Sequence, residues 1–200
     1  MANLGQIEKK VALFGGTFDP VHSGLLEVAE RACETLGLDQ VVFLPCRQSP
    51  HKEAAAGASE QDRLEMLKLA TAGMKWAVVS DWEFHQPMPS YSWRTAESFQ
   101  EEMPNARLFW LMGWDQWEVL PSWDRFSYFC QLVEFIVHAR HGRDGAAISH
   151  EGARVSLVSG DHPASSSEIR ELCSLKAKIP SLWVPQKVEE YIEVRRLYAK

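Results

Sequence analysis

The sequence predicts an α/β fold, a Rossmann-like doubly wound parallel sheet in a single domain. Short apolar runs recur along the chain, helical patterns separate them, and a double glycine follows the first run. Near-continuous apolar strands joined by helices are typical of a parallel sheet covered on both faces. With 200 residues and 46% hydrophobic content, the chain is long enough to bury one core. We therefore expect one domain, 1–200, with a C-terminal helical portion, about 165–200, packed on the same core.

The first unit of this pattern is a strand, a glycine turn and a helix. The apolar run from Val11 to Phe14 ends at Gly15-Gly16. A helical pattern then places Leu25, Ala29, Ala32 and Leu36 on one stripe before Gly37 ends it.

Later segments repeat the alternation. Ser59 and Asp62 form the spacing of a capping box, which predicts a helix start. The other expected strands cover residues 41–44, 76–79, 108–112, 134–138 and 155–158. The other expected helices cover about 92–102, 116–120, 122–129, a serine-rich start at 165, and 185–196, with a surface loop at 140–152.

Composition narrows the class of protein. The net charge of -6 argues against a nucleic-acid partner, because a polyanion selects for excess Lys and Arg. Neither an apolar leader nor a run of about 18 apolar residues occurs, so we expect no export and no membrane span. The four cysteines are widely spaced and are expected to be reduced thiols. We therefore predict a cytoplasmic protein.

The turn from Gly15 to His22 is the first candidate site. Ligands of open α/β sheets bind beyond the carboxyl ends of the strands. Glycines let backbone amides approach an anion, the next helix N-terminus adds positive potential, and His22 stands beside it as a donor. The alternative is a tight turn whose glycines serve packing only. Neither the dinucleotide glycine spacing nor a P-loop occurs.

The run Gly15-Gly16-Thr17-Phe18-Asp19-Pro20-Val21-His22 resembles the signature of the bacterial nicotinate-nucleotide adenylyltransferases, in the H-x-G-H nucleotidyltransferase superfamily. The resemblance continues in order along nearly the whole chain. The further matching segments are Pro50-His51-Lys52, Arg63 to Leu67, Ser90-Tyr91-Ser92, Met112 to Asp115, Pro121-Ser122-Trp123, and Ser165 to Arg170.

The resemblance implies adenylyl transfer from ATP to nicotinate mononucleotide in NAD biosynthesis, with release of pyrophosphate. It implies that backbone amides of the turn bind ATP, that His22, Lys52 and Arg170 are catalytic, and that Mg²⁺ sits mainly on phosphate oxygens. The implied ATP-binding residues are Gly15, Gly16, Thr17, Phe18, His22, Ser165, Ser166 and Arg170.

The resemblance also implies a mononucleotide site. Its residues are His51, Ser90, Tyr91, Ser92, Asp115 and Trp123. Trp123 is expected to stack on the pyridine ring, and Asp115 to accept from ribose hydroxyls. Plainer roles stay open: Trp123 as a packing residue, Asp115 as a helix N-cap, and Ser165 as a helix cap.

One motif departs from the family. The H-x-G-H element reads His22-Ser23-Gly24-Leu25, so the histidine that in the family points at the α-phosphate is missing. Loss of one such donor slows chemistry on the order of 10²–10³, unless Lys52, Arg47 or His51 compensates. We therefore expect Leu25→His to raise the rate. The alternatives are an impaired nucleotide-binding homologue and a same-fold transferase with another phosphate acceptor.

The remaining histidines carry weaker signals. His138 and His141 are spaced like metal ligands, but a strand end between them does not favour a metal site. His85, His150 and His162 are expected to be solvated loop residues. The expected partners are small molecules, and a homo-oligomer is compatible with the sequence.

Overall fold

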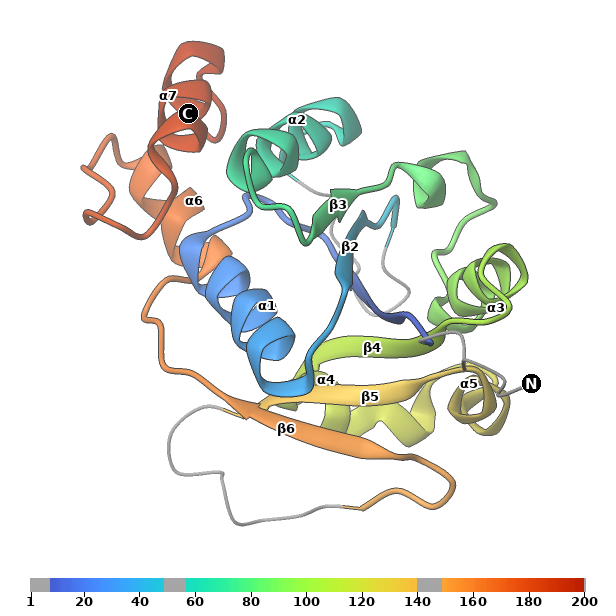
Figure 1. The fold of residues 1–200 in the computed structure, drawn as a ribbon. Coiled ribbons are helices and arrows are strands. Elements are labelled where there is room, and N and C mark those ends of the chain that lie inside the picture. The colour runs from blue at the N-terminus through green and yellow to red at the C-terminus, as the bar shows by residue number, and fades with distance from the viewer. Residues whose placement is uncertain (1–7, 49–56, 140–148, 200) are drawn as a thin grey trace.

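The sheet has six parallel strands in the order β3-β2-β1-β4-β5-β6 (Figure 1). The structure is a computed structural model that describes residues 8–48, 57–139 and 149–199. Its strands are β1 (Lys10–Gly16), β2 (Gln40–Pro45), β3 (Ala77–Val79), β4 (Arg107–Gly113), β5 (Glu134–Ala139) and β6 (Val155–Ser159). This order, with helical crossovers, confirms the doubly wound fold.

Helices cover both faces of the sheet. One face carries α1 (Ser23–Leu36), α2 (Glu60–Thr71), α6 (Ser166–Ser174) and α7 (Gln186–Arg195). The other carries α3 (Ser92–Glu102), α4 (Trp114–Val119) and α5 (Phe126–Leu132). Two 3-10 turns, η1 (Trp82–His85) and η2 (Leu120–Ser122), complete the described elements. No helix in the described ranges is long and apolar enough to span a bilayer.

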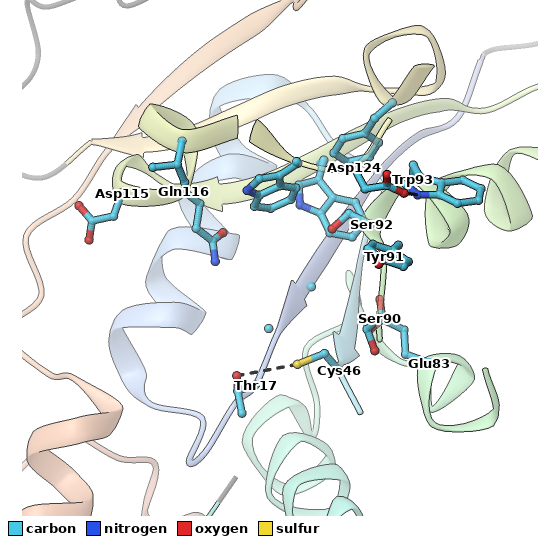
Figure 2. A pocket seen from close by; sticks show the side chains of 16 residues that line it. Thr17, Cys46, Glu83, Ser90, Tyr91, Ser92, Trp93, Asp115, Gln116 and Asp124 are labelled. Atoms are coloured by element: carbon cyan, nitrogen blue, oxygen red, sulfur yellow. Dashed lines mark hydrogen bonds between the residues drawn. The ribbon is translucent and has the colours of Figure 1, made fainter. Parts of the chain in front are cut away.

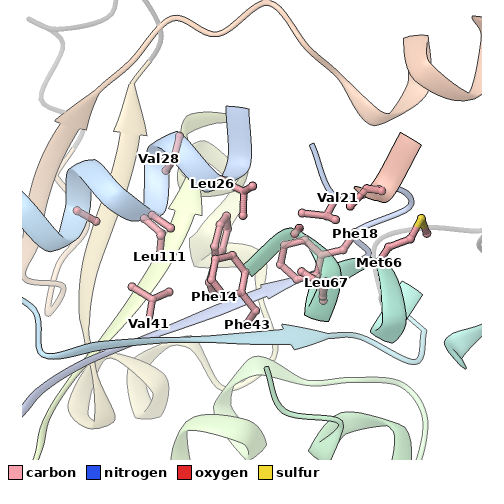
Figure 3. Packing of buried hydrophobic residues seen from close by; sticks show 14 of the residues in the cluster. Phe14, Phe18, Val21, Leu26, Val28, Val41, Phe43, Met66, Leu67 and Leu111 are labelled. Atoms are coloured by element: carbon pink, nitrogen blue, oxygen red, sulfur yellow. The ribbon is translucent and has the colours of Figure 1, made fainter. Parts of the chain in front are cut away.

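Alternation along the strands builds two cores. In β1, Ala12 and Phe14 join the cluster under α1 and α2, whereas Val11 and Leu13 join the cluster under α3 to α5. Successive strand side chains point to opposite faces, so a strand buried on both faces must be apolar throughout. Phe14, Phe18 and Phe43 meet at 5.4–5.9 Å between ring centroids in the first core (Figure 3).

The late helices share this core. Ile169 of α6 and Val188 and Ile192 of α7 are buried in the same cluster as Phe14. Full burial of each such side chain is worth about 1.5–3 kcal/mol. This packing places the N-terminal end of α6 beside the start of α1 (Figure 1).

All six expected strands are confirmed, and the helix boundaries need three corrections. The helix expected at 122–129 begins only at Phe126: Arg125 adopts a left-handed φ of 53° and α5 follows it, because that conformation cannot lie inside a right-handed helix. Helix α4 begins at Trp114, two residues before the expected start, and Pro185 is the N-cap of α7 rather than its first residue. The loop expected at 140–152 lies mostly outside the described residues.

The strand order reverses direction between β1 and β4. Successive crossovers leave β1 toward β2 and β3 on one side and reach β4, β5 and β6 on the other. The carboxyl ends of these two strands are Gly16 and Gly113. A crevice at such a switch point is where open α/β sheets bind ligands.

Candidate functional site

Two cavities border the glycine turn. The larger, of about 290 Å³, opens on the side of α3, α4 and α5, and the smaller, of about 90 Å³, lies between the start of α1 and the segment joining β6 to α6. Gly15, Gly16 and Thr17 line the larger cavity, and His22, Gly24 and Leu25 line the smaller one. The turn therefore runs from one cavity to the other.

A buried arginine fixes the turn against the second strand. Arg63 of α2 is 1% exposed. Its guanidinium donates to the carbonyl oxygens of Thr17 at 2.9 Å and Cys46 at 2.7 Å. Hydrogen bonds to a charged group are stronger than neutral ones, so the start of α2 sets the position of the turn. The capping box at Ser59 and Asp62, which begins this helix, is confirmed by a bond of 3.1 Å.

Asp19 links the turn to distant backbone. Its carboxylate accepts from the amides of Gly57 and Ala58 at 2.7 and 3.0 Å and from the Tyr198 hydroxyl at 2.8 Å. Burial, followed by the neighbouring Asp19 charge, raises the pKa of Tyr198 well above its usual value. The carboxylate of Asp19 therefore accepts hydrogen bonds from three groups of the protein, and these bonds fix the position of the turn.

The N-terminal end of α6 is joined to the same turn. The Ser166 hydroxyl donates to the Pro20 carbonyl at 2.9 Å, and Arg170 donates to the Asp19 carbonyl at 2.7 Å. Ser165 is the N-cap of α6, where its hydroxyl accepts from the Glu168 amide. These residues lie about 150 positions from the turn in sequence, so the fold gathers the predicted ATP-binding residues around one backbone segment.

The glycines of the turn have a packing reason as well. A Cβ on Gly15 would lie 2.7 Å from a ring carbon of Trp110, and one on Gly16 would lie 3.1 Å from the Phe18 ring. Phe18 itself is a buried core residue with a φ of 50°. The packing alternative therefore explains Gly15. Both glycines also line the larger cavity, where the absence of a side chain leaves their backbone uncovered.

The larger cavity gathers the predicted mononucleotide residues that the structure describes. Ser90, Tyr91, Ser92, Asp115 and Trp123 all line it (Figure 2). Trp123 stacks on Phe129, with ring planes 13° apart and centroids 6.3 Å apart. Trp123 therefore has a packing role, and it also lines the cavity. His51 lies outside the described residues.

Backbone bonds hold the Ser90 segment in place. The Ser90 hydroxyl accepts from the Arg47 amide at 3.2 Å, and the Ser90 amide donates to the Gln48 carbonyl at 3.0 Å. The end of β2 thereby positions the segment that begins α3.

Sequence reasoning missed several residues of this cavity. Trp93 stacks on Tyr91 and donates through Nε1 to Asp124 at 2.9 Å. The centroid of its ring lies 4.2 Å from the guanidinium carbon of Arg125. Glu83 is 4% exposed and accepts from the Thr95 hydroxyl at 2.8 Å. Burial raises the pKa of Glu83, although hydrogen bonds from Thr95 and Ser90 oppose the shift. The position of Trp93 directly after Ser92 was the only signal in the sequence.

Several expectations about single residues need correction. The N-cap of α4 is Gly113, so the N-cap alternative for Asp115 is wrong; Asp115 lies in the first turn, and in Figure 2 its carboxylate is turned away from the indole rings. Arg47 pairs with Glu60 at 3.2 Å and lines neither cavity, so it is placed poorly to compensate for Leu25. Lys52 lies outside the described residues.

The histidines also differ from expectation. His85 is exposed, as expected. His150 is half-buried, its ring lies tilted by 47° against the ring of Trp117 with centroids 4.5 Å apart, and its Nε2 is 2.7 Å from the Trp117 carbonyl oxygen. His162 is half-buried beside Gly24. His150 and His162 lie in loops, as predicted, but their side chains are only partly exposed. His138 binds the Gly160 carbonyl at 2.9 Å, and His141 lies outside the described residues.

Comparisons with known proteins identify relatives of this chain. The cytidylyltransferase-like family model matches residues 13–172. A protein of Methylacidiphilum infernorum, named probable nicotinate-nucleotide adenylyltransferase, is 37% identical over 196 residues, covering 94% of this chain and 92% of that protein. One of the same name from Neisseria meningitidis serogroup C is 35% identical over 204 residues, covering 96% and 100%.

Solved structures resemble the fold. The Plasmodium falciparum nicotinic acid mononucleotide adenylyltransferase complexed with NaAD superposes with a TM-score of 0.77 at 20% identity, covering 96% of this chain and 98% of that one. The same enzyme complexed with APC gives a TM-score of 0.75. At this identity the likeness concerns the architecture alone.

Proposed function

The chain belongs to the nicotinate-nucleotide adenylyltransferase family within the cytidylyltransferase-like proteins, and we propose that it transfers the adenylyl group of ATP to nicotinate mononucleotide. The products are nicotinate adenine dinucleotide, a precursor of NAD, and pyrophosphate. The observation that carries the proposal is the shared turn: Gly15 to Thr17 line the larger cavity, and His22 lines the smaller one.

Each cavity is assigned to one substrate. The aromatic cavity suits the pyridine ring of the mononucleotide, with Trp123 as a stacking surface and the Ser90–Ser92 segment near the nicotinate carboxylate. The smaller cavity, with His22 and the N-terminal end of α1, suits the phosphates of ATP. Ser166 and Arg170 face the turn from α6 and complete the phosphate site, with Lys52 as a further charge.

The reaction proceeds by substitution at phosphorus. An oxygen of the mononucleotide phosphate attacks the α-phosphorus of ATP and forms a new phosphorus–oxygen bond. The bond between the α-phosphorus and the α,β-bridging oxygen breaks, and pyrophosphate leaves with the electron pair. Positioning and charge stabilisation supply most of the catalysis for such a step. The turn, held by Arg63 and Asp19, provides that positioning.

Mg²⁺ accompanies ATP in this proposal and is held mainly by phosphate oxygens and water. Asp19, the acidic side chain of the turn, is already bonded to two amides and a tyrosine hydroxyl, which leaves it poorly suited as a direct ligand. The ion neutralises charge on the pyrophosphate when bound.

A reducing, cytoplasmic setting fits the four cysteines, all of which are free thiols. Burial raises the pKa of Cys33 and Cys130 to about 11, so these thiols stay protonated and unreactive near neutral pH.

A direct assay tests the proposal. The purified protein is incubated with ATP, Mg²⁺ and either nicotinate or nicotinamide mononucleotide, and pyrophosphate and dinucleotide are measured. We expect product with nicotinate mononucleotide and a higher kcat/KM for it than for the nicotinamide form. Pantetheine phosphate and glycerol phosphate serve as control acceptors. Product only with a control acceptor would identify another transferase, and measurable ATP binding without any product would favour a nucleotide-binding homologue impaired by Leu25.

A further inference from the structure

The smaller cavity holds a second imidazole that the motif does not supply. Leu25 stands where relatives carry the second histidine of H-x-G-H, and its side chain lines this cavity. His162, from the segment between β6 and α6, lines it too. We propose that His162 supplies the missing donor and contacts the phosphates of ATP beside His22. The proposal rests on the proposed function, because it assigns a residue to the same site.

The two histidine rings are neighbours. His162 Cβ and Nδ1 lie 3.1 and 3.2 Å from the point where a Cβ on Gly24 would stand, and His22 Cε1 lies 3.2 Å from that same point. A Cβ at position 24 would lie in tight contact with both side chains, so one of them would have to shift by a few tenths of an ångström. Gly24 therefore has a steric role that the sequence does not reveal: it leaves room for the two imidazole side chains at the start of α1.

The orientation of the His162 ring makes Nε2 the donor. The Ala164 amide donates to His162 Nδ1 at 3.1 Å. Since Nδ1 accepts this bond, a neutral ring must carry its proton on Nε2. Within the described part of the chain no protein group is bonded to Nε2, and the side chain is half-buried. The segment thus supplies an N–H donor on a side chain that lines the smaller cavity.

Groups of both signs surround the cavity, and the start of α1 is the feature that favours an anion. The N-terminal end of α1, a helix of 14 residues, contributes positive potential. Glu27 and Asp161 also line the cavity, but Glu27 is paired with Arg31 at 2.7 Å and Asp161 is exposed. His138 borders the far side, where it binds the Gly160 carbonyl. Leu25 packs against the hydrophobic core, so an apolar residue there is compatible with a donor on the opposite wall.

A swap of the histidine between the two walls tests the proposal. In His162→Ala, kcat for dinucleotide formation should fall on the order of 10²–10³, with KM for ATP changed by only a few fold. In the His162→Ala background, Leu25→His should restore kcat by at least about tenfold. His162→Gln, which keeps an N–H donor, should retain more activity than His162→Ala.

The control for these variants is His150→Ala, which removes a half-buried histidine that lines neither cavity. An unchanged kcat in His162→Ala, or no recovery in the double variant, would overturn the proposal.

A binding measurement separates this proposal from the proposed reaction. In protein with ¹⁵N-labelled histidine, ATP should shift the His162 ring signals, identified by their loss in His162→Gln, whereas adenosine should not. Equal shifts with adenosine would mean that the ring contacts the base, and the phosphate assignment would fall. This readout applies even if the wild type forms no dinucleotide, in which case the proposed function fails independently of His162.

Discussion

The two cavities beside the glycine turn differ in how closely they follow their family. The larger cavity is lined by every described member of the predicted mononucleotide set, each in the segment that the sequence motifs indicated. The smaller cavity keeps His22 but has Leu25 in place of the second histidine and His162 on the opposite wall. On one side of the turn the motif residues line the cavity, whereas on the other side a distant loop contributes a histidine to the lining.

The difference has a structural cause. The larger cavity is built from the ends of β1, β2 and β4 together with α3 to α5, and aromatic rings fill its walls. Replacing one ring there disturbs several stacked neighbours, such as Trp123 and Phe129. The smaller cavity lies under a segment that leaves β6 as an irregular chain, where a side chain is exchanged at less cost to packing.

The largest effect should come from His22, the motif histidine that lines the smaller cavity. His22 is 8% exposed at the N-cap of α1. His22→Ala should lower kcat on the order of 10²–10³, with the mononucleotide KM nearly unchanged, because the residue lines only the smaller cavity. Steady-state kinetics with both substrates measure this. The control is His85→Ala, which removes an exposed histidine that lines neither cavity. Full activity in His22→Ala would mean that the phosphate site is misplaced.

A smaller effect, on KM for the mononucleotide rather than on kcat, should appear on the other side of the turn. Trp123→Ala removes a stacking surface worth about 1–3 kcal/mol, so KM for the mononucleotide should rise about tenfold to a hundredfold while KM for ATP stays the same. Trp123→Phe should recover most of the affinity. Trp82→Phe is the control, because Trp82 packs on Phe99 away from the cavity lining. A parallel rise in both KM values would contradict the division of substrates between the cavities.

Local pattern predicts the strands because each is an apolar run buried on both faces. It fails for 122–129, where the left-handed Arg125 delays the helix, and nothing in the local residue pattern marks that conformation. The position of His162 is unreadable for a different reason: Gly24 and His162 meet only through the tertiary fold. The contact between Gly15 and Trp110 depends in the same way on the pairing of β1 with β4. Order along the chain thus predicts the larger cavity, and only the fold reveals the second wall of the smaller one.

The smallest effect concerns a carboxyl group found only in the larger cavity. Burial raises the pKa of Glu83 in the folded protein, so the folded state retains this proton more tightly than the unfolded state. As pH rises from the ordinary pKa of a glutamate through the raised folded value, wild-type stability should fall relative to Glu83→Gln. Gln keeps an oxygen to accept from Thr95 and carries no charge, so we expect the free energy of unfolding of Glu83→Gln to exceed that of the wild type by on the order of 1 kcal/mol near neutral pH.

Urea unfolding of both proteins between pH 4 and 8 measures the difference, with Glu101→Gln on the exposed end of α3 as the control. A difference that does not change with pH would show that Glu83 is equally protonated in both states, and ATP affinity should remain at the wild-type value throughout because Glu83 does not border the smaller cavity.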